Sequence, residues 1–361
     1  MSINRFITPT LALVIALAAL SGCTVAPKPT PTSGATASPS PSIAYSQPAV
    51  PSSRFDFDCE EVAPLPSVAG FIGASAAPIV AYPDPTVSGG TIENMSNLAN
   101  IALIQAGAVE CAWTVDGSAP ALTIKVIPDA TSEYATLVPG LFGLPQVDGI
   151  GDRAYGGCVA SGIAYCDFQV LVGGTWISIT PNELVAVPQT VESITAFTRQ
   201  VVSVVAKSPP ATPRWTAPPT AVGASVDCAS LLAASQLATL GLPAAKDLHG
   251  EGYFGGYLGD AVTAIDGGRG CAWGGVTTLI LPGASWAWTS HPPLSNVSIT
   301  VGPVSGLGDE AFVGCTALSG SSQCTAQMLV GTTWVGVDGP FANVGAIRDF
   351  AAVELSALQR N

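Results

Sequence analysis

The stretch Gly149-Ile-Gly-Asp-Arg-Ala-Tyr-Gly-Gly-Cys158 returns in the second half of the chain as Gly306-Leu-Gly-Asp-Glu-Ala-Phe-Val-Gly-Cys315. After each copy come a second cysteine and a Val-Gly-x-Thr-Trp motif, which ends at Trp176 and at Trp334. β-Branched and aromatic runs on both sides of a short turn predict a β-hairpin. The copies lie 157 residues apart, from 149 to 306, and so long a period indicates two whole domains rather than a solenoid.

Two further pairs of motifs precede the hairpins. Asp58-Cys59 matches Asp227-Cys228, and Cys111-Ala-Trp113 matches Cys271-Ala-Trp273. We expect strands at the Cys-Ala-Trp motifs and at 121–127, 152–159, 163–172 and 175–179, and a helix at 230–240. A closing helix is expected in each repeat, with apolar positions from Val191 to Val205 and an end before Pro209 in the first, and with apolar positions from Val344 to Leu358 in the second. Strands between terminal helices predict an α+β fold of two tandem repeats, each a mainly antiparallel sheet in an α/β sandwich-like arrangement.

The N-terminal 22 residues are typical of a signal peptide. Arg5 precedes a ten-residue apolar run, 11–20, which is too short to span a bilayer as a helix. Leu20-Ser-Gly-Cys23 matches the lipobox of bacterial lipoproteins, in which the cysteine is acylated and the chain is cut just before it. An ordinary secretory signal that ends in cysteine is the alternative. We expect Cys23 to anchor the mature chain to the extracytoplasmic face of the cell membrane.

Composition divides the rest of the chain. Residues 23–54 are rich in Pro, Ser, Thr and Ala, which predicts a disordered, lipid-anchored tether. Residues 207–226 form a second Pro-rich segment and predict a linker. Repeat domain 1 is then expected over 55–206 and repeat domain 2 over 227–361.

The cysteines predict disulfides. Besides Cys23, each repeat has four: Cys59, Cys111, Cys158 and Cys166 in the first, and Cys228, Cys271, Cys315 and Cys324 in the second. Three pairings are open in each repeat. We favour Cys158–Cys166 and Cys315–Cys324, which would link the arms of a hairpin, and hence Cys59–Cys111 and Cys228–Cys271. The wide spacing argues against zinc, and we expect no metal and no cofactor.

Charge and motifs exclude several functions. A formal charge of −13 with 12 Lys and Arg excludes electrostatic binding of nucleic acid. Gly250-Glu-Gly-Tyr-Phe-Gly255 fits a dinucleotide-binding pattern but follows no predicted strand. His249 and His291 have no counterparts in the first repeat, and the chain has no Gly-x-Ser-x-Gly elbow. We therefore expect no catalytic residues.

Aromatic residues without counterparts in the first repeat mark a candidate ligand or contact surface. Trp286 and Trp288 alternate with Ala287, so we expect them on one side of a strand. Tyr253 and Tyr257 lie in a glycine-rich loop nearby in the sequence. For Asp152 and Asp309, which follow Gly-x-Gly, we expect hydrogen bonds to the turn that starts the next strand.

The order of these motifs, with a helix at the end, resembles actinobacterial lipoproteins of unknown function. The second repeat fits better, through Asp227-Cys228-Ala-Ser-Leu-Leu, whereas Pro64 and Pro66 break the expected helix in the first. The resemblance implies an α/β sandwich-like domain with a central antiparallel sheet, and it transfers no activity.

These observations predict a cell-envelope lipoprotein without catalytic activity, which displays two tandem binding or interaction domains outside the cytoplasmic membrane. One alternative is a carrier or sensor of small molecules or lipids. A second is a secreted hydrolase that uses His249 and His291. The expected partners are the membrane, through Cys23, and envelope proteins or small apolar ligands.

Overall fold

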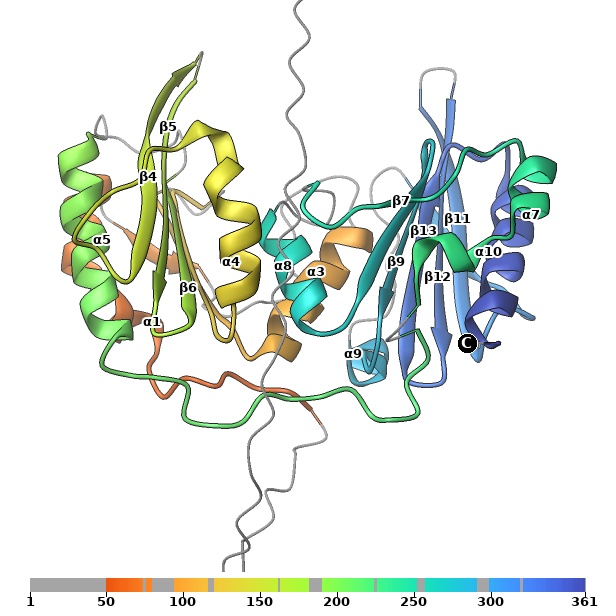
Figure 1. Cartoon of the computed structure of the whole chain (residues 1–361), viewed down its shortest axis with the longest axis horizontal. Coiled ribbons are helices and arrows are strands. Elements are labelled where there is room, and N and C mark those ends of the chain that lie inside the picture. The colour runs from red at the N-terminus through yellow and green to blue at the C-terminus, as the bar shows by residue number, and fades with distance from the viewer. Residues whose placement is uncertain are drawn as a thin grey trace, which may run out of the picture. The chain divides into compact units, whose positions relative to one another are not determined.

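Two antiparallel sheets, one in each repeat, dominate the computed structural model (Figure 1). The structure describes residues 50–73, 76–79, 94–115, 120–161, 163–181, 190–223, 226–251, 257–290, 299–318 and 321–360. The predicted signal peptide, Cys23 and most of the predicted tether lie outside these ranges. Residues Gln47–Asn361 form one compact unit.

The described part of the first repeat contains a six-stranded sheet in the order β1-β2-β3-β6-β5-β4. Every neighbouring pair is antiparallel. The four strand positions predicted after the Cys-Ala-Trp motif are confirmed. The strands are β1 (Ala77–Ile79), β2 (Val109–Thr114), β3 (Leu122–Ile127), β4 (Arg153–Ser161), β5 (Ile163–Val172) and β6 (Thr175–Pro181).

The second repeat has the same sheet with one more strand, in the order β10-β11-β12-β13-β9-β8-β7 among its described residues. Even the register is shared, since Trp176 pairs with Leu171 and Trp334 with Leu329. The strands are β7 (Lys246–Asp247), β8 (Arg269–Trp273), β9 (Val276–Leu281), β10 (Thr300–Pro303), β11 (Glu310–Leu318), β12 (Ser321–Val330) and β13 (Thr333–Gly339).

One face of each sheet is covered by the repeat's own terminal helices. Apolar side chains of α5 and α10 complete two separate core clusters with these faces, and both helices lie where a closing helix is predicted. The helices on these faces are α1 (Cys59–Val62), α2 (Leu65–Ile72) and α5 (Val191–Val205) in the first repeat, and α6 (Cys228–Leu231), α7 (Ala234–Leu240) and α10 (Val344–Leu358) in the second.

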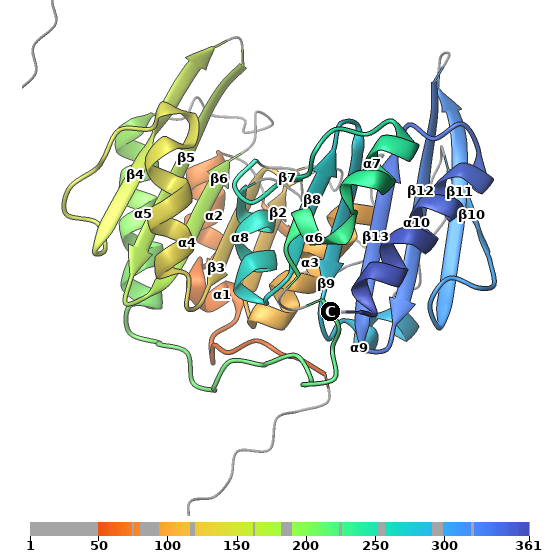
Figure 2. The ribbon, with the colours of Figure 1, turned by 45° about the vertical axis from the view of Figure 1, so that its right-hand side comes forward.

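A third core cluster joins the two repeats. Helix α3 of the first repeat packs against α8 and against β9 and β13 of the second, while α8 packs against α4 of the first. Figure 2 shows α3 and α8 between the two sheets. The elements of this layer are α3 (Asn94–Ala106), α4 (Thr131–Leu137), the 3-10 helix η1 (Val138–Gly143), α8 (Tyr257–Ile265) and α9 (Ser285–Ser290). The predicted domain boundaries stay a prediction, but the repeats are not packed independently.

All four disulfides have the predicted pairing. Cys59–Cys111 and Cys228–Cys271 each join the first helix of a repeat to its Cys-Ala-Trp strand. Cys158–Cys166 and Cys315–Cys324 each join directly opposed residues of a hairpin. Each repeat is therefore tied covalently at its start and within its hairpin.

The repeated Gly-x-Gly-Asp motif connects a strand to a turn further along the chain. Asp152 Oδ2 accepts a hydrogen bond of 2.7 Å from Gly173 N, and Asp309 Oδ2 accepts one of 2.6 Å from Gly331 N. The expectation that these carboxylates bond the turn starting the next strand is wrong, because they bond the turn one hairpin later. At Gly308, φ is +63° and a Cβ would lie 2.3 Å from the carbonyl oxygen of Leu329, so a side chain has no room there.

One predicted helix is divided in the structure. In place of a single helix over 230–240, α6 ends at Leu231 and α7 begins at Ala234. The extended backbone between them buries both Leu231 and Leu232 in the second-repeat core. Adjacent residues of a straight helix point in different directions, so the interruption is what lets both side chains reach this core.

The described residues include the end of the first Pro-rich segment and most of the second. Arg54, predicted to close the disordered tether, is 9% exposed and forms an ion pair with Asp129. Its backbone oxygen accepts a hydrogen bond from Ala211 of the predicted linker. In the same linker, Trp215 is buried against Gly283. Among the described residues, no helix is long and apolar enough to cross a membrane.

Candidate functional site

A polar cavity of about 280 Å³ lies where the two repeats meet. Its wall combines a carboxylate of the first repeat with polar residues of β7, α8 and β8 of the second. The residues that matter chemically are Glu133, Asp247, His249, Asp260, Thr263 and Arg269. Concave sites with a few convergent polar groups are the usual form of ligand sites, so this cavity is the leading candidate.

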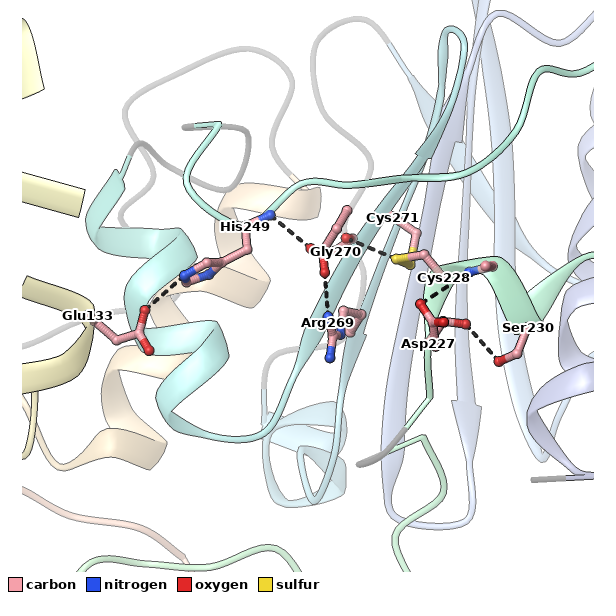
Figure 3. A network of polar contacts seen from close by, with 10 residues as sticks. Glu133, Asp227, Cys228, Ser230, His249, Arg269, Gly270 and Cys271 are labelled. Carbon is pink, nitrogen blue, oxygen red and sulfur yellow. Dashed lines mark hydrogen bonds and ion pairs between the residues drawn. A yellow bond between two sulfur atoms is a disulfide. The ribbon is translucent and has the colours of Figure 1, made fainter. Parts of the chain in front are cut away.

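One contact between a histidine and a carboxylate crosses from repeat to repeat at this cavity. His249 Nε2 lies 3.0 Å from Glu133 Oε2, and Figure 3 shows the two side chains pointing toward one another. Glu133 stands in the first turn of α4, whereas His249 follows β7. The backbone N–H of His249 donates to Asp247 Oδ1 over 3.0 Å, which orients the loop that carries the imidazole.

The cavity's guanidinium is already paired. Asp247 Oδ2 accepts a short hydrogen bond from Arg269 Nη1, since β7 and β8 pair antiparallel and place Asp247 opposite Cys271. Lys246 beside it contacts Glu251 Oε2 at 2.8 Å. The cations on this rim are thus neutralised by neighbouring carboxylates.

Helix α8 supplies the inner wall. Asp260 and Thr263 are three residues apart and lie on one face of the helix, and they are 2% and 3% exposed. The hydroxyl oxygen of Thr263 has no hydrogen-bond partner among the described residues. Leaving a buried polar atom without a hydrogen-bond partner costs about 1–3 kcal/mol of folding free energy. A polar group of a bound ligand would supply the hydrogen bond that this hydroxyl lacks among the described residues.

Of the predicted aromatic surface, only part is described. Tyr253 lies outside the described residues, as do His291 and Cys23. Tyr257 is half-buried at the first position of α8.

The strand predicted at Trp286 and Trp288 is wrong, because both belong to helix α9. Trp288 is 3% exposed, and its ring lies edge-on to Trp334 with 4.7 Å between the centroids. Its indole N–H donates to Glu310 Oε2 over 2.7 Å. Trp286 is half-buried against the same core cluster. Trp288 therefore packs the core that joins the repeats and is not on an exposed surface.

In each sheet the matched tryptophan donates a buried hydrogen bond to a glutamine. Trp176 Nε1 donates to Gln169 Oε1 over 2.7 Å, and Trp334 Nε1 donates to Gln327 Oε1 over 2.8 Å. The glutamines stand at the same distance before each tryptophan in the sequence, so the repeat alignment contained a signal for this contact.

Next to this hydrogen bond, each sheet pairs an aspartate with a threonine, but the strand that carries the aspartate in one repeat carries the threonine in the other. Asp167 bonds Thr180 in the first sheet, and Asp338 bonds Thr325 at the matching positions of the second, with the acid on the other strand. Burial raises the pKa of Asp167 to about 6 and that of Asp338 to about 7. These two acids do not line the cavity. Aligning the repeats position by position does not reveal the pairs, because an aspartate in one repeat faces a threonine in the other.

Acidic side chains at 58–61, at the start of the first repeat, accept hydrogen bonds from backbone N–H groups. Asp58 and Glu61 form a reciprocal capping box at the first helix, and Glu60 accepts a hydrogen bond from the N–H of Leu65. In the described residues there is no cluster of three or more His, Cys, Asp or Glu side chains placed to hold a metal ion.

Sequence reasoning singled out His249 but missed its partner Glu133, which lies 116 positions earlier, and it missed Asp260 and Thr263. No signal of spacing links these residues, because the packing of α4 against α8 brings them together. Comparison with protein-family models, with curated proteins and with solved structures finds no match to this chain.

Proposed function

We propose that this chain is a lipid-anchored binding protein of the cell envelope, in which the two repeats act as one unit and the cavity between them holds a small ligand. The cavity is the observation that carries the proposal, because its wall needs both repeats. Four disulfides fit an oxidising, extracytoplasmic compartment. The lipobox motif at Cys23 supports the anchor, and envelope proteins remain proposed partners beside the ligand.

A hydrolase is the second candidate, and the contact between His249 and Glu133 is what favours it. A general base held by a carboxylate is part of many hydrolytic sites. However, the contacts that His249 makes with described residues, through its ring and through its backbone N–H, are both to carboxylates, so a nucleophile for it to activate is not part of the described geometry. We therefore place binding before hydrolysis.

The anchor is tested by metabolic labelling in a bacterial host. We expect palmitate to be incorporated into the wild-type chain and into a Thr24→Ser control, and to be lost in Cys23→Ser. Two acyl chains hold a protein stably on a bilayer, so the Cys23→Ser chain should also leave the membrane fraction. Equal labelling of Cys23→Ser and the wild type would contradict the anchor.

The ligand site is tested by filling the cavity. Ala264 lines it, and Ala264→Phe should reduce by about tenfold or more the amount of any small molecule that co-purifies with the full chain. The matched control is Ala238→Phe on the exposed side of α7. Mass spectrometry of the denatured proteins measures the difference, and a thermal melt shows that the variant is folded. If Ala264→Phe and the control carry the same small molecules, the cavity is not the ligand site.

A further inference from the structure

We infer that the cavity selects a neutral ligand rich in hydroxyl groups, of the size of one sugar ring; this inference rests on the proposed function. The first argument concerns cations, which need a carboxylate that is free to pair with them. Asp247 already accepts hydrogen bonds on both oxygens, from the N–H of His249 and from Arg269. The imidazole of His249 lies 3.0 Å from Glu133, and Asp260 is not free either. The carboxylates of the wall are therefore all engaged.

An anionic ligand is disfavoured as well. The guanidinium of Arg269 lines the cavity but contacts Asp247. Three carboxylates line the same cavity, those of Glu133, Asp247 and Asp260, and like charges repel at short range. Moving a charge out of water costs free energy, which is recovered only when a close partner of opposite charge replaces the water. A neutral ligand avoids this cost, so the wall favours it over both kinds of ion.

The wall still offers hydrogen bonds of both kinds. The carboxylates of Glu133 and Asp247 have several lone pairs each, so they can accept further hydrogen bonds. Arg269 carries five N–H donors, and the hydrogen bond to Asp247 uses one of them. The Thr263 hydroxyl is buried and has no partner among the described residues. Hydroxyl groups of a ligand match this wall because they both donate and accept, whereas an apolar ligand would leave the Thr263 oxygen unpaired.

The size of the cavity limits the ligand. Its volume of about 280 Å³ is at the lower end of the range for small-molecule pockets. One six-membered ring with its hydroxyl groups suits such a volume, whereas a lipid chain would extend beyond it. Gly267, Gly268 and Gly270 form part of the wall, and without side chains they let a ring approach the backbone closely. A monosaccharide or a cyclic polyol is the class of ligand that fits.

Matched sugars of different charge test the inference. Glucose, galactose and mannose, each beside its amino sugar and its uronic acid, and myo-inositol are titrated by calorimetry into the full chain, in a detergent without sugar groups. We expect at least one neutral compound to bind, and to bind about tenfold or more tightly than its charged analogues where these exist. Added salt should leave its affinity unchanged, because salt screens only interactions between charges. An amino sugar or uronic acid that binds as tightly, or no binding by any neutral compound, would overturn the inference.

Variants at Thr263 place the ligand in the cavity. Thr263→Val keeps the side-chain shape but removes the hydroxyl, and it should weaken the tightest neutral compound about tenfold. Thr263→Ser keeps the hydroxyl and should retain the affinity within about threefold. The matched control is Thr239→Val, at an exposed threonine of α7, which should change nothing. Unchanged affinity in a folded Thr263→Val chain overturns the inference, and Ala264→Phe serves in its place if that variant does not fold.

The same experiments separate this inference from the proposed function. If a small molecule co-purifies with the chain but is charged or lacks hydroxyl groups, the proposed function stands and only the neutral, hydroxylated class falls. If nothing co-purifies and none of the neutral compounds binds, both fail.

Discussion

Cys228→Ala combined with Cys271→Ala will lower the free energy of unfolding by about 4 kcal/mol. The bond joins α6 to β8 across a sequence separation of 43 residues. Cross-linking so long a loop restricts the unfolded chain, and the cost of closing the loop returns when the bond is absent. Both sulfurs also lie in the second-repeat core, so the alanines leave a small void.

The matched control is the hairpin bond of the same repeat. Cys315 and Cys324 are separated by 9 residues, and replacing both by Ala should cost about 2.5 kcal/mol, because the loop is shorter. Urea denaturation followed by circular dichroism measures both losses. Equal losses for the long and the short bond would show that loop length is not the source of the stabilisation.

Stability will fall as the pH rises from about 5 to about 9, and Glu354→Gln will remove the part of that fall that Glu354 contributes beside the other buried acids Asp167 and Asp338. Glu354 is fully buried on α10, and burial raises its pKa to about 8, although the hydrogen bond from Thr278 lowers it in part. The folded chain therefore holds a proton that the unfolded chain releases near pH 4.5. This contribution to stability is complete below that pH and is lost as the pH rises through about 8.

The glutamine side chain stays neutral and can accept the same hydrogen bond from the Thr278 hydroxyl, which spans 3.1 Å. At pH 9 we expect Glu354→Gln to exceed the wild type by about 2–4 kcal/mol, and at pH 5 to equal it within about 1 kcal/mol. Asp349→Asn changes an exposed acid on the same helix and should leave the pH profile as it is. Parallel pH profiles for Glu354→Gln and the wild type would contradict the assignment.

Much of the architecture follows from local signals. Helix α5 lies at the predicted closing helix and ends before Pro209, because its apolar residues recur with helical spacing and proline follows. The hairpins and all four disulfides follow from matched motifs in two copies. Trp286 and Trp288 show the limit of such signals, since alternation over three residues fits a strand and a helical turn alike, and packing against Trp334 decided for the helix.

The candidate site was less accessible to sequence reasoning. His249 stood out as one of two histidines, but its partner is a glutamate of the other repeat, and Asp260 and Thr263 carry no motif. Their meeting depends on α4 and α8 being neighbours, which is a contact between residues far apart in the chain.

By itself, the sequence determined the duplication, the strands and closing helices of each repeat, and the cysteine pairs, because these depend on residues close in the chain or on matched copies. Only the tertiary structure decided that α3 and α8 pack between the two sheets and that a polar cavity forms there. The physical reason is that burying an apolar helix face lowers the free energy equally well against either repeat. Periodicity reports that a face must be covered, whereas shape and packing select what covers it.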